Sequence, residues 1–347
     1  MCIRDSHPAG DSASTRRRDD VHTSVRSKWF GMLYAVAFSD VQAAHSRLAG
    51  TVNRTPVVRS PRIDELAGRS VFLKCENLQH VGAFKFRGAS NAIEILGASA
   101  ERGVCTHSSG NHAQALALAA KKRGIPAYIV MPSNAPMVKV RGVQSHDAEI
   151  TFCEPNLEAR SKAADSIIER TGAAFVHPFD NPDVIAGQGT AMIEMIEDCA
   201  DLDAIMTPIG GGGLLSGSCI ATRELLPEAR LFGAEPEGAD DAARSLEAGH
   251  FVPQNSPNTI CDGLLTSLGE LTWPILRDHL EEVVTVSDDE VLTAMVLLHE
   301  EFQMIVEPSG AICLAAILKD EFHNLVGIDR IGIILSGGNV DEDSLPF

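Results

Sequence analysis

Residues 204–217, AIMTPIGGGGLLSG, combine a short apolar run, four consecutive glycines and the start of a second apolar segment. A short run of buried residues is typical of a strand, and the second segment is typical of a helix. Successive glycines let several backbone N–H groups converge, and the N-terminus of the helix adds its dipole. The stretch therefore predicts a strand, a phosphate-binding loop at Gly210, Gly211, Gly212 and Gly213, and a helix.

A dinucleotide-binding loop of the form G-x-G-x-x-G/A is the main alternative for this stretch. The spacing fails by one residue, because Leu215 or Ser216 occupies the last position of the pattern. No Lys-Ser/Thr pair follows, so the loop does not match a P-loop either. Glu235, about 20 residues further on, keeps the nicotinamide alternative open.

Apolar runs alternate with helical patterns along most of the chain. The runs are almost wholly apolar, as the strands of a parallel sheet covered on both faces must be. This alternation predicts an α/β fold with right-handed crossovers. The predicted strands are 71–74, 104–107, 127–131, 149–153, 173–177, 204–207, 231–234, 283–286 and 331–335. The clearest predicted helices are 113–123, 157–170 and 288–303, and a capping box at Ser39 and Gln42 opens a first helix that ends near Gly50.

Lys85 lies in an unusual setting, since residues 81–88 read VGAFKFRG. Placing an ammonium group among apolar residues is costly, and burial lowers the pKa of a lysine. The neutral amine is then available as a Schiff-base nucleophile. A lysine that extends from the start of a helix into solvent is the alternative.

Residues 106–112, THSSGNH, join a predicted strand to a predicted helix. Hydroxyl groups, an amide and free backbone N–H groups at a helix N-terminus can bind an anion such as a substrate carboxylate. Helix capping explains one such residue but not the whole run. A fourth polar segment, LSGGN at residues 335–339, follows the last predicted strand. Ser336 could donate to or accept from a ring nitrogen there, although the segment is also a good turn.

In combination, these four segments make the chain resemble the threonine dehydratase and serine racemase family, the pyridoxal phosphate (PLP) enzymes of fold-type II. The likeness covers roughly residues 38–347. It implies a tryptophan synthase β-like fold with two open parallel-sheet α/β domains and the cofactor between them. We assign 38–102 and 181–347 to a large PLP-binding domain, and 103–180 to a small inserted substrate-binding domain.

The resemblance implies roles around the cofactor. Lys85 would form the Schiff base with PLP, and Phe84 would pack near the ring. Gly210, Gly211, Gly212 and Gly213 would bind the phosphate. Glu307, in the segment EPSG at residues 307–310, matches a glutamate near the cofactor, with helix capping as its alternative.

The same resemblance implies further contacts to the ring and to the substrate. Asn111 would bond the ring hydroxyl, and Ser336 would bond the pyridine nitrogen. The substrate carboxylate would lie against Ser108, Ser109, Asn111 and His112.

A divalent cation is implied at residues 235–241, EPEGADD. Relatives hold it with the residues that match Glu235, the carbonyl of Ala239, and Asp241. Two carboxylates and a carbonyl are hard oxygen ligands that suit Mg²⁺ or Ca²⁺. An acidic loop favoured by a helix N-terminus is the alternative.

For the reaction, the resemblance implies an ammonia-lyase that converts L-threonine or L-serine to 2-oxobutanoate or pyruvate plus ammonia. Lys85 would remove the α-proton. Ser109 matches the serine that acts on the opposite face in serine racemases, so serine racemase stays an alternative, as does 3-hydroxyaspartate ammonia-lyase. Lys85 and Ser336 argue against a non-enzymatic scaffold. We also expect a homodimer, and no regulatory domain or feedback control by isoleucine, because the chain ends soon after Ser336.

Composition excludes some partners and locations. A net charge of −18 argues against nucleic acid, which requires a clustered basic face. No apolar stretch reaches the roughly 18 residues of a membrane-spanning helix. The eight cysteines are scattered without metal-binding spacing, which predicts buried thiols in a reducing compartment.

We expect residues 1–37 to form a disordered extension, because the first 28 residues are polar and aperiodic. Residues 29–37 also imitate a signal peptide, with Ala35-Val36-Ala37 as the cleavage site. Acidic residues upstream spoil the basic region that such a signal needs. A cytoplasmic location is therefore expected.

Overall fold

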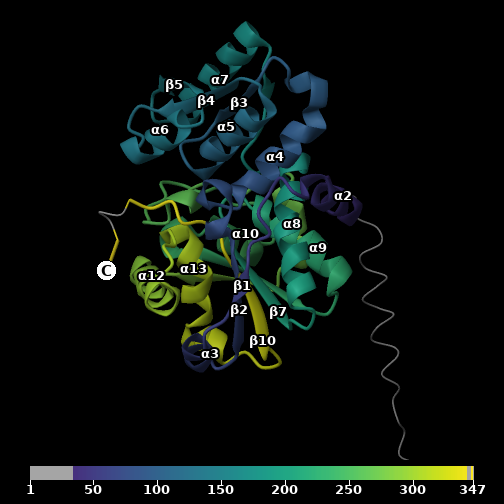
Figure 1. The fold of residues 1–347 in the computed structure, drawn as a ribbon. Coiled ribbons are helices and arrows are strands. Elements are labelled where there is room, and N and C mark those ends of the chain that lie inside the picture. The colour runs from purple at the N-terminus through teal and green to yellow at the C-terminus, as the bar shows by residue number, and fades with distance from the viewer. Residues whose placement is uncertain (1–33, 342–344, 347) are drawn as a thin grey trace, which may run out of the picture. The chain divides into compact units, whose positions relative to one another are not determined.

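The computed structural model describes residues 34–341, 345 and 346, and the chain from Ala35 onward forms one compact unit. Its described part contains a six-stranded sheet and a four-stranded sheet, both with helices against their faces (Figure 1). The predicted α/β fold with parallel sheets is confirmed. The proposed domain boundaries at 102/103 and 180/181 stay a prediction.

The larger sheet is parallel except at one edge. Its short edge strand β1 pairs antiparallel with β2, and all other neighbours are parallel. In spatial order its strands are β1 (Val57–Val58), β2 (Ser70–Cys75), β10 (Arg330–Leu335), β7 (Ala204–Pro208), β8 (Arg230–Pro236) and β9 (Glu282–Val286).

Helices cover both faces of the larger sheet. Helices α12 and α13 lie on one side of β2, β10 and β7, and α8 and α9 lie on the other (Figure 1). The helices of this part are α2 (Phe38–Leu48), α3 (Pro61–Ala67), α4 (Lys85–Leu96), α8 (Pro182–Asp198), α9 (Gly213–Leu225), α10 (Asp241–Ala248), α11 (Thr272–His279), α12 (Asp288–Phe302), α13 (Pro308–Ile317) and α14 (Asp320–His323). Short 3₁₀ turns are η1 (Glu76–Leu78), η2 (His80–Gly82), η3 (Gly97–Ala100), η4 (Glu237–Ala239) and η5 (Asp262–Leu264).

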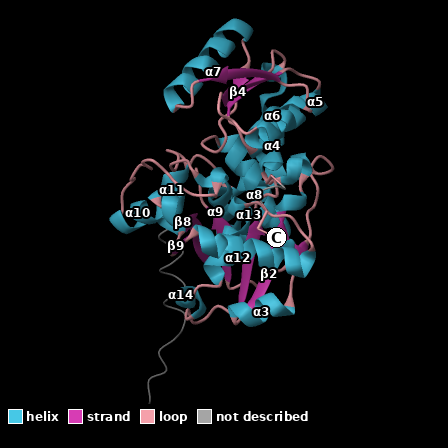
Figure 2. Cartoon of the chain, turned by 90° about the vertical axis from the view of Figure 1, so that its left-hand side faces the viewer, coloured by secondary structure: helices cyan, strands magenta, loops and turns pink. Residues whose placement is uncertain are grey.

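The smaller sheet is parallel throughout. Helix α7 packs on one of its sides, and α5 and α6 pack on the other (Figures 1 and 2). In spatial order its strands are β5 (Glu149–Cys153), β4 (Ala127–Pro132), β3 (Val104–His107) and β6 (Ala174–Phe175). Its helices are α5 (Asn111–Arg123), α6 (Met137–Gln144) and α7 (Leu157–Thr171).

Burial explains why the apolar runs became strands. Every residue of β7 is buried, and β2 and β10 are buried after their first residue. Strand β5 is different, because Glu149 and Phe152 are exposed there, as expected of an edge strand. The central strands thus have the two covered faces that their sequences require.

All nine predicted strands are present, one of them clearly shorter than predicted, and the larger sheet has one further strand. The run 173–177 yields only Ala174–Phe175, because this strand pairs only with Val104 and Cys105 of β3. Strand β1 was not predicted, since two valines are too short a run to indicate a strand.

The predicted capping box at the first helix is wrong. Helix α2 begins at Phe38, so Ser39 lies inside it rather than before it. The carboxylate of Asp40 accepts a hydrogen bond of 2.8 Å from the N–H of Ala37, which leaves no capping role for Gln42. The helix ends at Leu48, close to the expected Gly50. The expected disorder and signal-like character of residues 1–37 lie almost wholly outside the described residues.

The cysteines of the described residues are free thiols, and most are buried. Cys153 is half-buried, and the buried ones are Cys75, Cys105, Cys199, Cys219, Cys261 and Cys313. Their predicted role as small buried side chains is confirmed, while Cys2 lies outside the described residues. Among residues 34–341, no helix is both long and apolar enough to cross a membrane.

Candidate active site

Lys85 is the first residue of α4, and its amine points to the segment that follows β6. Its Nζ donates a hydrogen bond of 2.8 Å to the carbonyl of Pro178 and lies 5.2 Å from the centre of the Phe84 ring. Burial lowers the pKa of Lys85 to about 8, although the charge of Glu307 opposes this shift. The lowered pKa increases the fraction of neutral amine, which is the form that acts as a nucleophile or base.

The segment before Lys85 is fastened to the loop after β10. The N–H of Phe84 donates to the carbonyl of Ser336 at 3.1 Å, and Ala83 forms an isolated antiparallel bridge with Gly337. The hydroxyl of Ser336 donates to the carbonyl of Ser309 at 3.3 Å. The first and the last of the four predicted segments are therefore brought together.

Asn111, at the start of α5, contacts the same loop from the smaller sheet. Its Nδ2 donates to Glu307 at 2.7 Å, and its Oδ1 accepts from Asn339 at 2.9 Å. Glu307 immediately precedes α13, but its side chain makes no capping hydrogen bond, so the capping alternative is wrong. Burial raises the pKa of Glu307 to about 7, while Lys139, Asn111 and Lys85 act to lower it.

The serine-rich segment lies at the carboxyl end of β3. Ser108 and Ser109 are half-buried, and Ser108 accepts a weak hydrogen bond of 3.4 Å from the N–H of Gly110. His112 is buried on α5, and its Nε2 lies 3.3 Å from the carbonyl of Val176. Burial, together with the charge of Lys85, holds the pKa of His112 well below its usual value.

The four glycines sit where β7 passes into α9, as predicted. Gly212 has a φ of +84°, a conformation that favours glycine, and the carbonyl of Gly211 accepts a 2.8 Å hydrogen bond from Thr272. Phe179 packs directly on the loop, because a Cβ added at Gly211 or at Gly213 would meet it at 2.2 Å or 3.0 Å. The carbonyl of Pro178 accepts a hydrogen bond from Lys85, and the next residue, Phe179, packs on the glycine loop. The glycine loop therefore lies near the lysine.

The glycine loop has the donors that a phosphate needs. Gly210 to Gly213 are buried, and within the described residues their N–H groups donate to no other group of the chain. Buried N–H groups are costly unless they are paired. An anion with several oxygens would pair them, and the N-terminus of α9 favours its charge.

Glu235 and Asp241 lie close together, but in the described residues they make no metal-binding group of three acidic, histidine or cysteine side chains. Glu235 accepts from the N–H groups of Ala242 and Ala243 at 3.1 and 3.0 Å. Asp241 accepts from the N–H of Leu268 through Oδ2, while its buried Oδ1 accepts no hydrogen bond from the described residues. Burial raises the pKa of Glu235 to about 9 and that of Asp241 to about 6.

Two cationic residues near the predicted site segments were missed in the sequence. Lys139 of α6 forms an ion pair with Asp262 of η5, and burial lowers its pKa. Arg160 of α7 is half-buried near His107, and its Nε–H donates to no partner among the described residues. Its charge, after burial, helps to lower the pKa of His107. Neither residue lies directly after a predicted strand, where functional residues were expected, so neither was identified.

Comparison with known proteins defines the class of this chain. A family model described as pyridoxal-phosphate dependent enzyme matches residues 48–337. The chain therefore belongs to the family of PLP-dependent enzymes.

Its similar relatives narrow the class to the serine racemase and dehydratase group. The chain is 48% identical over 313 residues to a serine racemase of Dictyostelium discoideum, across 89% of this chain and 97% of that protein. It is 46% identical over 316 residues to a β-hydroxyaspartate dehydratase of Paracoccus denitrificans (strain Pd 1222), across 91% of this chain and 100% of that protein. The structure of maize serine racemase matches with a TM-score of 0.89 at 46% identity, across 90% of this chain and 96% of that one.

The residues at the cleft fit PLP. A lysine with a lowered pKa suits the aldehyde, and a loop of unpaired buried N–H groups suits the phosphate. The two features lie on either side of Pro178 and Phe179.

Proposed function

We propose that this chain racemises serine and also eliminates ammonia from serine and related 3-hydroxy amino acids. Lys85 and Ser109 are its two proton-transfer groups. The similarity to serine racemases supports this function better than threonine dehydration as the main role. The observation that carries it is a buried lysine whose pKa is lowered to about 8, in a chain that also has a half-buried serine at the carboxyl end of β3.

The proposed cofactor contacts follow the geometry. Lys85 would hold the cofactor covalently, and the N–H groups of Gly210–Gly213 would bind its phosphate. Phe84 would pack near the ring. Asn111 would bond the ring hydroxyl and Ser336 the pyridine nitrogen; both side chains lie at the loop after β10.

The proposed chemistry divides the work between cofactor and protein. PLP, when bound, draws electrons from the α-carbon of the amino acid, so that its proton can leave. Once the amine of the substrate has replaced Lys85 on the cofactor, the freed amine of Lys85 would take that proton, because burial lowers its pKa to about 8. Racemisation then needs a proton delivered on the opposite face, which we assign to the hydroxyl of Ser109. In elimination the β-hydroxyl leaves as water instead, with the proton that Lys85 has taken from the α-carbon, and hydrolysis of the enamine yields the 2-keto acid and ammonia.

Ser109→Ala tests this division. Elimination from an L-amino acid needs Lys85 alone on one face, whereas racemisation needs both groups. We therefore expect the variant to lose D-serine formation almost completely. Elimination of L-serine should survive within roughly tenfold, or about 1.4 kcal/mol of barrier. Chiral chromatography of serine and a keto-acid assay, on one preparation, measure both rates.

Ser108→Ala is the matched control, since it should change racemisation and elimination in parallel. Equal loss of both activities in Ser109→Ala would show that Ser109 serves carboxylate binding only. A wild-type protein that never forms D-serine would refute the racemase function.

Elimination from 3-hydroxyaspartate is a second candidate function, favoured by Arg160. Its guanidinium lies beside His107 at the end of β3, and its buried Nε is unpaired in the described residues. A buried unpaired guanidinium nitrogen is costly, and a carboxylate is its natural partner. The second carboxylate of 3-hydroxyaspartate supplies one, and serine does not. The similarity to a β-hydroxyaspartate dehydratase supports the same reaction.

Arg160→Met should separate the two substrates. A hydrogen bond to a charged group contributes about 1.5–3 kcal/mol, so kcat/KM for 3-hydroxyaspartate should fall roughly 10- to 150-fold. The kcat/KM for L-serine should change far less. Arg160→Lys should retain part of the kcat/KM for 3-hydroxyaspartate that Arg160→Met loses. Parallel falls for both substrates would mean that Arg160 binds the carboxylate common to them.

We also propose a structural Mg²⁺ or Ca²⁺ at Glu235, the Ala239 carbonyl and Asp241. The unpaired Oδ1 of Asp241 and the raised pKa values of both acids support it, because a cation would offset the cost of burying two charges. A homodimer and a cytoplasmic location remain predictions from the sequence.

A further inference from the structure

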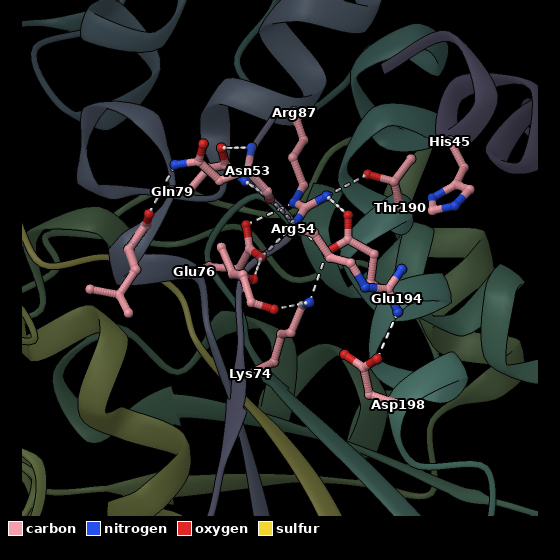
Figure 3. A network of polar contacts seen from close by, with 12 residues as sticks. His45, Asn53, Arg54, Lys74, Glu76, Gln79, Arg87, Thr190, Glu194 and Asp198 are labelled. Carbon is pink, nitrogen blue, oxygen red and sulfur yellow. Dashed lines mark hydrogen bonds and ion pairs between the residues drawn. The ribbon is translucent and has the colours of Figure 1, made fainter. Parts of the chain in front are cut away.

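Two residues after Lys85 in the sequence, Arg87 belongs to a cluster of four buried charges, defined by Lys74, Glu76, Arg87 and Glu194 (Figure 3). Arg87 donates to Glu76 through Nε and Nη2, both at 2.8 Å. It also donates to Glu194 through Nη1 and Nη2, again at 2.8 Å. Lys74 donates to Glu194 at 2.7 Å, so two positive and two negative groups balance.

The cluster joins three elements at one point. Arg87 belongs to the first turn of α4, Glu76 follows β2, and Glu194 lies on α8. Neutral groups complete it, since Arg87 also donates to Thr190 and to the carbonyl of Asn53 at 3.3 Å. Every nitrogen of the guanidinium is therefore bound.

Arg87 and Lys85 face opposite ways from the same turn. A helix rotates by about 100° per residue, so side chains two positions apart point to opposite sides. Arg87 is completely buried in the cluster, while Lys85 reaches Pro178 across the cleft. The position of the lysine amine thus depends on the turn that Arg87 anchors.

Stability alone is a poor explanation for this cluster. Well-packed apolar residues often stabilise a core as well as a buried ion pair does, or better. Four charges joined by directional hydrogen bonds instead fix the relative positions of the elements that carry them. Helix α4 also has other attachments to α8, because Gly88 and Gly187 touch closely and Asn91 donates to the carbonyl of Asp183 at 2.7 Å. Gly88 adjoins Arg87, and just before the helix the N–H of Phe84 donates to the carbonyl of Ser336. The side chain of Arg87 adds to these contacts the hydrogen bonds that tie the first turn to Glu76 and Glu194.

We propose that Arg87 is a positioning residue for Lys85, and that the buried cluster fixes the direction of the lysine amine. This inference rests on the proposed role of Lys85. It extends that role to a group that touches neither cofactor nor substrate. A misplacement of about 1 Å in a catalytic group can cost roughly 100-fold in rate.

The test measures Lys85 in the cofactor-free protein. Competitive acetylation at a series of pH values, read by mass spectrometry, gives the pKa of Lys85, about 8 in the wild type. The charged groups that face Lys85 are Glu307, His112 and His177, and none of them belongs to the cluster. A changed pKa therefore reports a changed position of the amine.

Arg87→Lys keeps the charge but not the forked geometry, and the double variant Arg87→Met, Glu76→Gln keeps the cluster neutral. In both, we expect the pKa of Lys85 to rise toward its ordinary 10.5. Turnover per bound cofactor should fall by roughly 100-fold with little change in KM. If neither variant folds, the pKa of Lys85 and the turnover are measured in Glu76→Gln alone. We again expect the pKa to rise and the turnover to fall.

Arg69→Met is the matched control. Arg69 is also a buried arginine, and it donates to the carbonyls of Phe322 and His323 beyond the other end of β2. This variant should lower the melting temperature but leave the pKa of Lys85 unchanged. The inference is overturned if the Arg87 variants behave like this control.

Borohydride reduction of the wild type with PLP keeps the two proposals distinguishable. If the cofactor is fixed on a peptide without Lys85, the proposed function of Lys85 fails. The acetylation result still decides whether Arg87 positions that amine.

Discussion

Two lysines, Lys85 and Lys139, lie in the cleft, and their surroundings separate their roles. Lys139 is paired with the carboxylate of Asp262. Lys85 has a backbone carbonyl and the face of Phe84 beside its amine, and it forms no ion pair among the described residues. Burial lowers the pKa of both amines against the charge of Glu307, but the ion pair with Asp262 engages Lys139 and leaves Lys85 the amine available for reaction. The environment thus supports the proposed role of Lys85 as the cofactor-binding lysine.

Replacing Lys85 should therefore abolish turnover and the visible absorbance of bound cofactor without unfolding the protein. The lowered pKa means that the folded state disfavours the charged amine, so its stability rises with pH between about 8 and 10.5. Lys85→Met removes this cost, and the cofactor-free variant should melt no lower than the wild type at pH 7.

Borohydride reduction of the wild type locates the attachment independently, because it should fix the cofactor on the peptide that contains Lys85. A labelled peptide that contains Lys74 or Lys139 would contradict the assignment.

At the scale of elements, the strands and the four polar segments were predictable, but the pairing of the segments was not. Apolar runs identify strands, and chemistry gathers at their carboxyl ends. The order of strands in the sheet is not visible in such a pattern. The hydrogen bond between Asn111 and Glu307 spans 196 positions of sequence, and the one between Lys85 and Pro178 spans 93. Such contacts depend on which sheet each segment joins.

Helix α10 and the preceding strand β8 carry the two acidic residues of the proposed cation site. The carboxylate of Glu235 lies at the N-terminus of α10, where it accepts hydrogen bonds from two backbone N–H groups. Even so, burial and the nearby Asp241 raise its pKa to about 9. Without a cation the two acids should stay partly protonated at neutral pH.

Chelation should expose this pH dependence. Both acids have a folded-state pKa above the unfolded value, so their contribution to stability is present at low pH and is lost as pH rises toward 9. In EDTA, the melting temperature should fall between pH 5 and pH 9, because ionisation then occurs in a buried site. Mg²⁺ or Ca²⁺ should flatten this curve and add about 2.7 kcal/mol at 100 times its dissociation constant. Identical melting curves with and without chelator would exclude a structural cation.

At the scale of the whole molecule, the candidate active site is also the junction between the two sheets. Polar contacts join segments of the smaller sheet to segments of the larger one at the carboxyl ends of the strands. In the described residues they include Lys85 with Pro178, Asn111 with Glu307, and Lys139 with Asp262. A ligand held from both sides should therefore stabilise the junction as well as fill the site.

Hydrogen exchange can follow this coupling through the glycine loop. The N–H groups of Gly210–Gly213 have no acceptor among the described residues, so they lack the hydrogen bonds that protect the strands. PLP should slow their exchange strongly, and exchange in residues 108–112 should slow with it. Amides in β7 and β10 are already paired within the sheet and should change little. Pyridoxal, which carries the aldehyde but no phosphate, is the matched control: it can react with Lys85 but should leave the glycine amides unprotected. Equal protection by pyridoxal and PLP would mean that the loop responds to closure of the cleft rather than to a phosphate bound on its N–H groups.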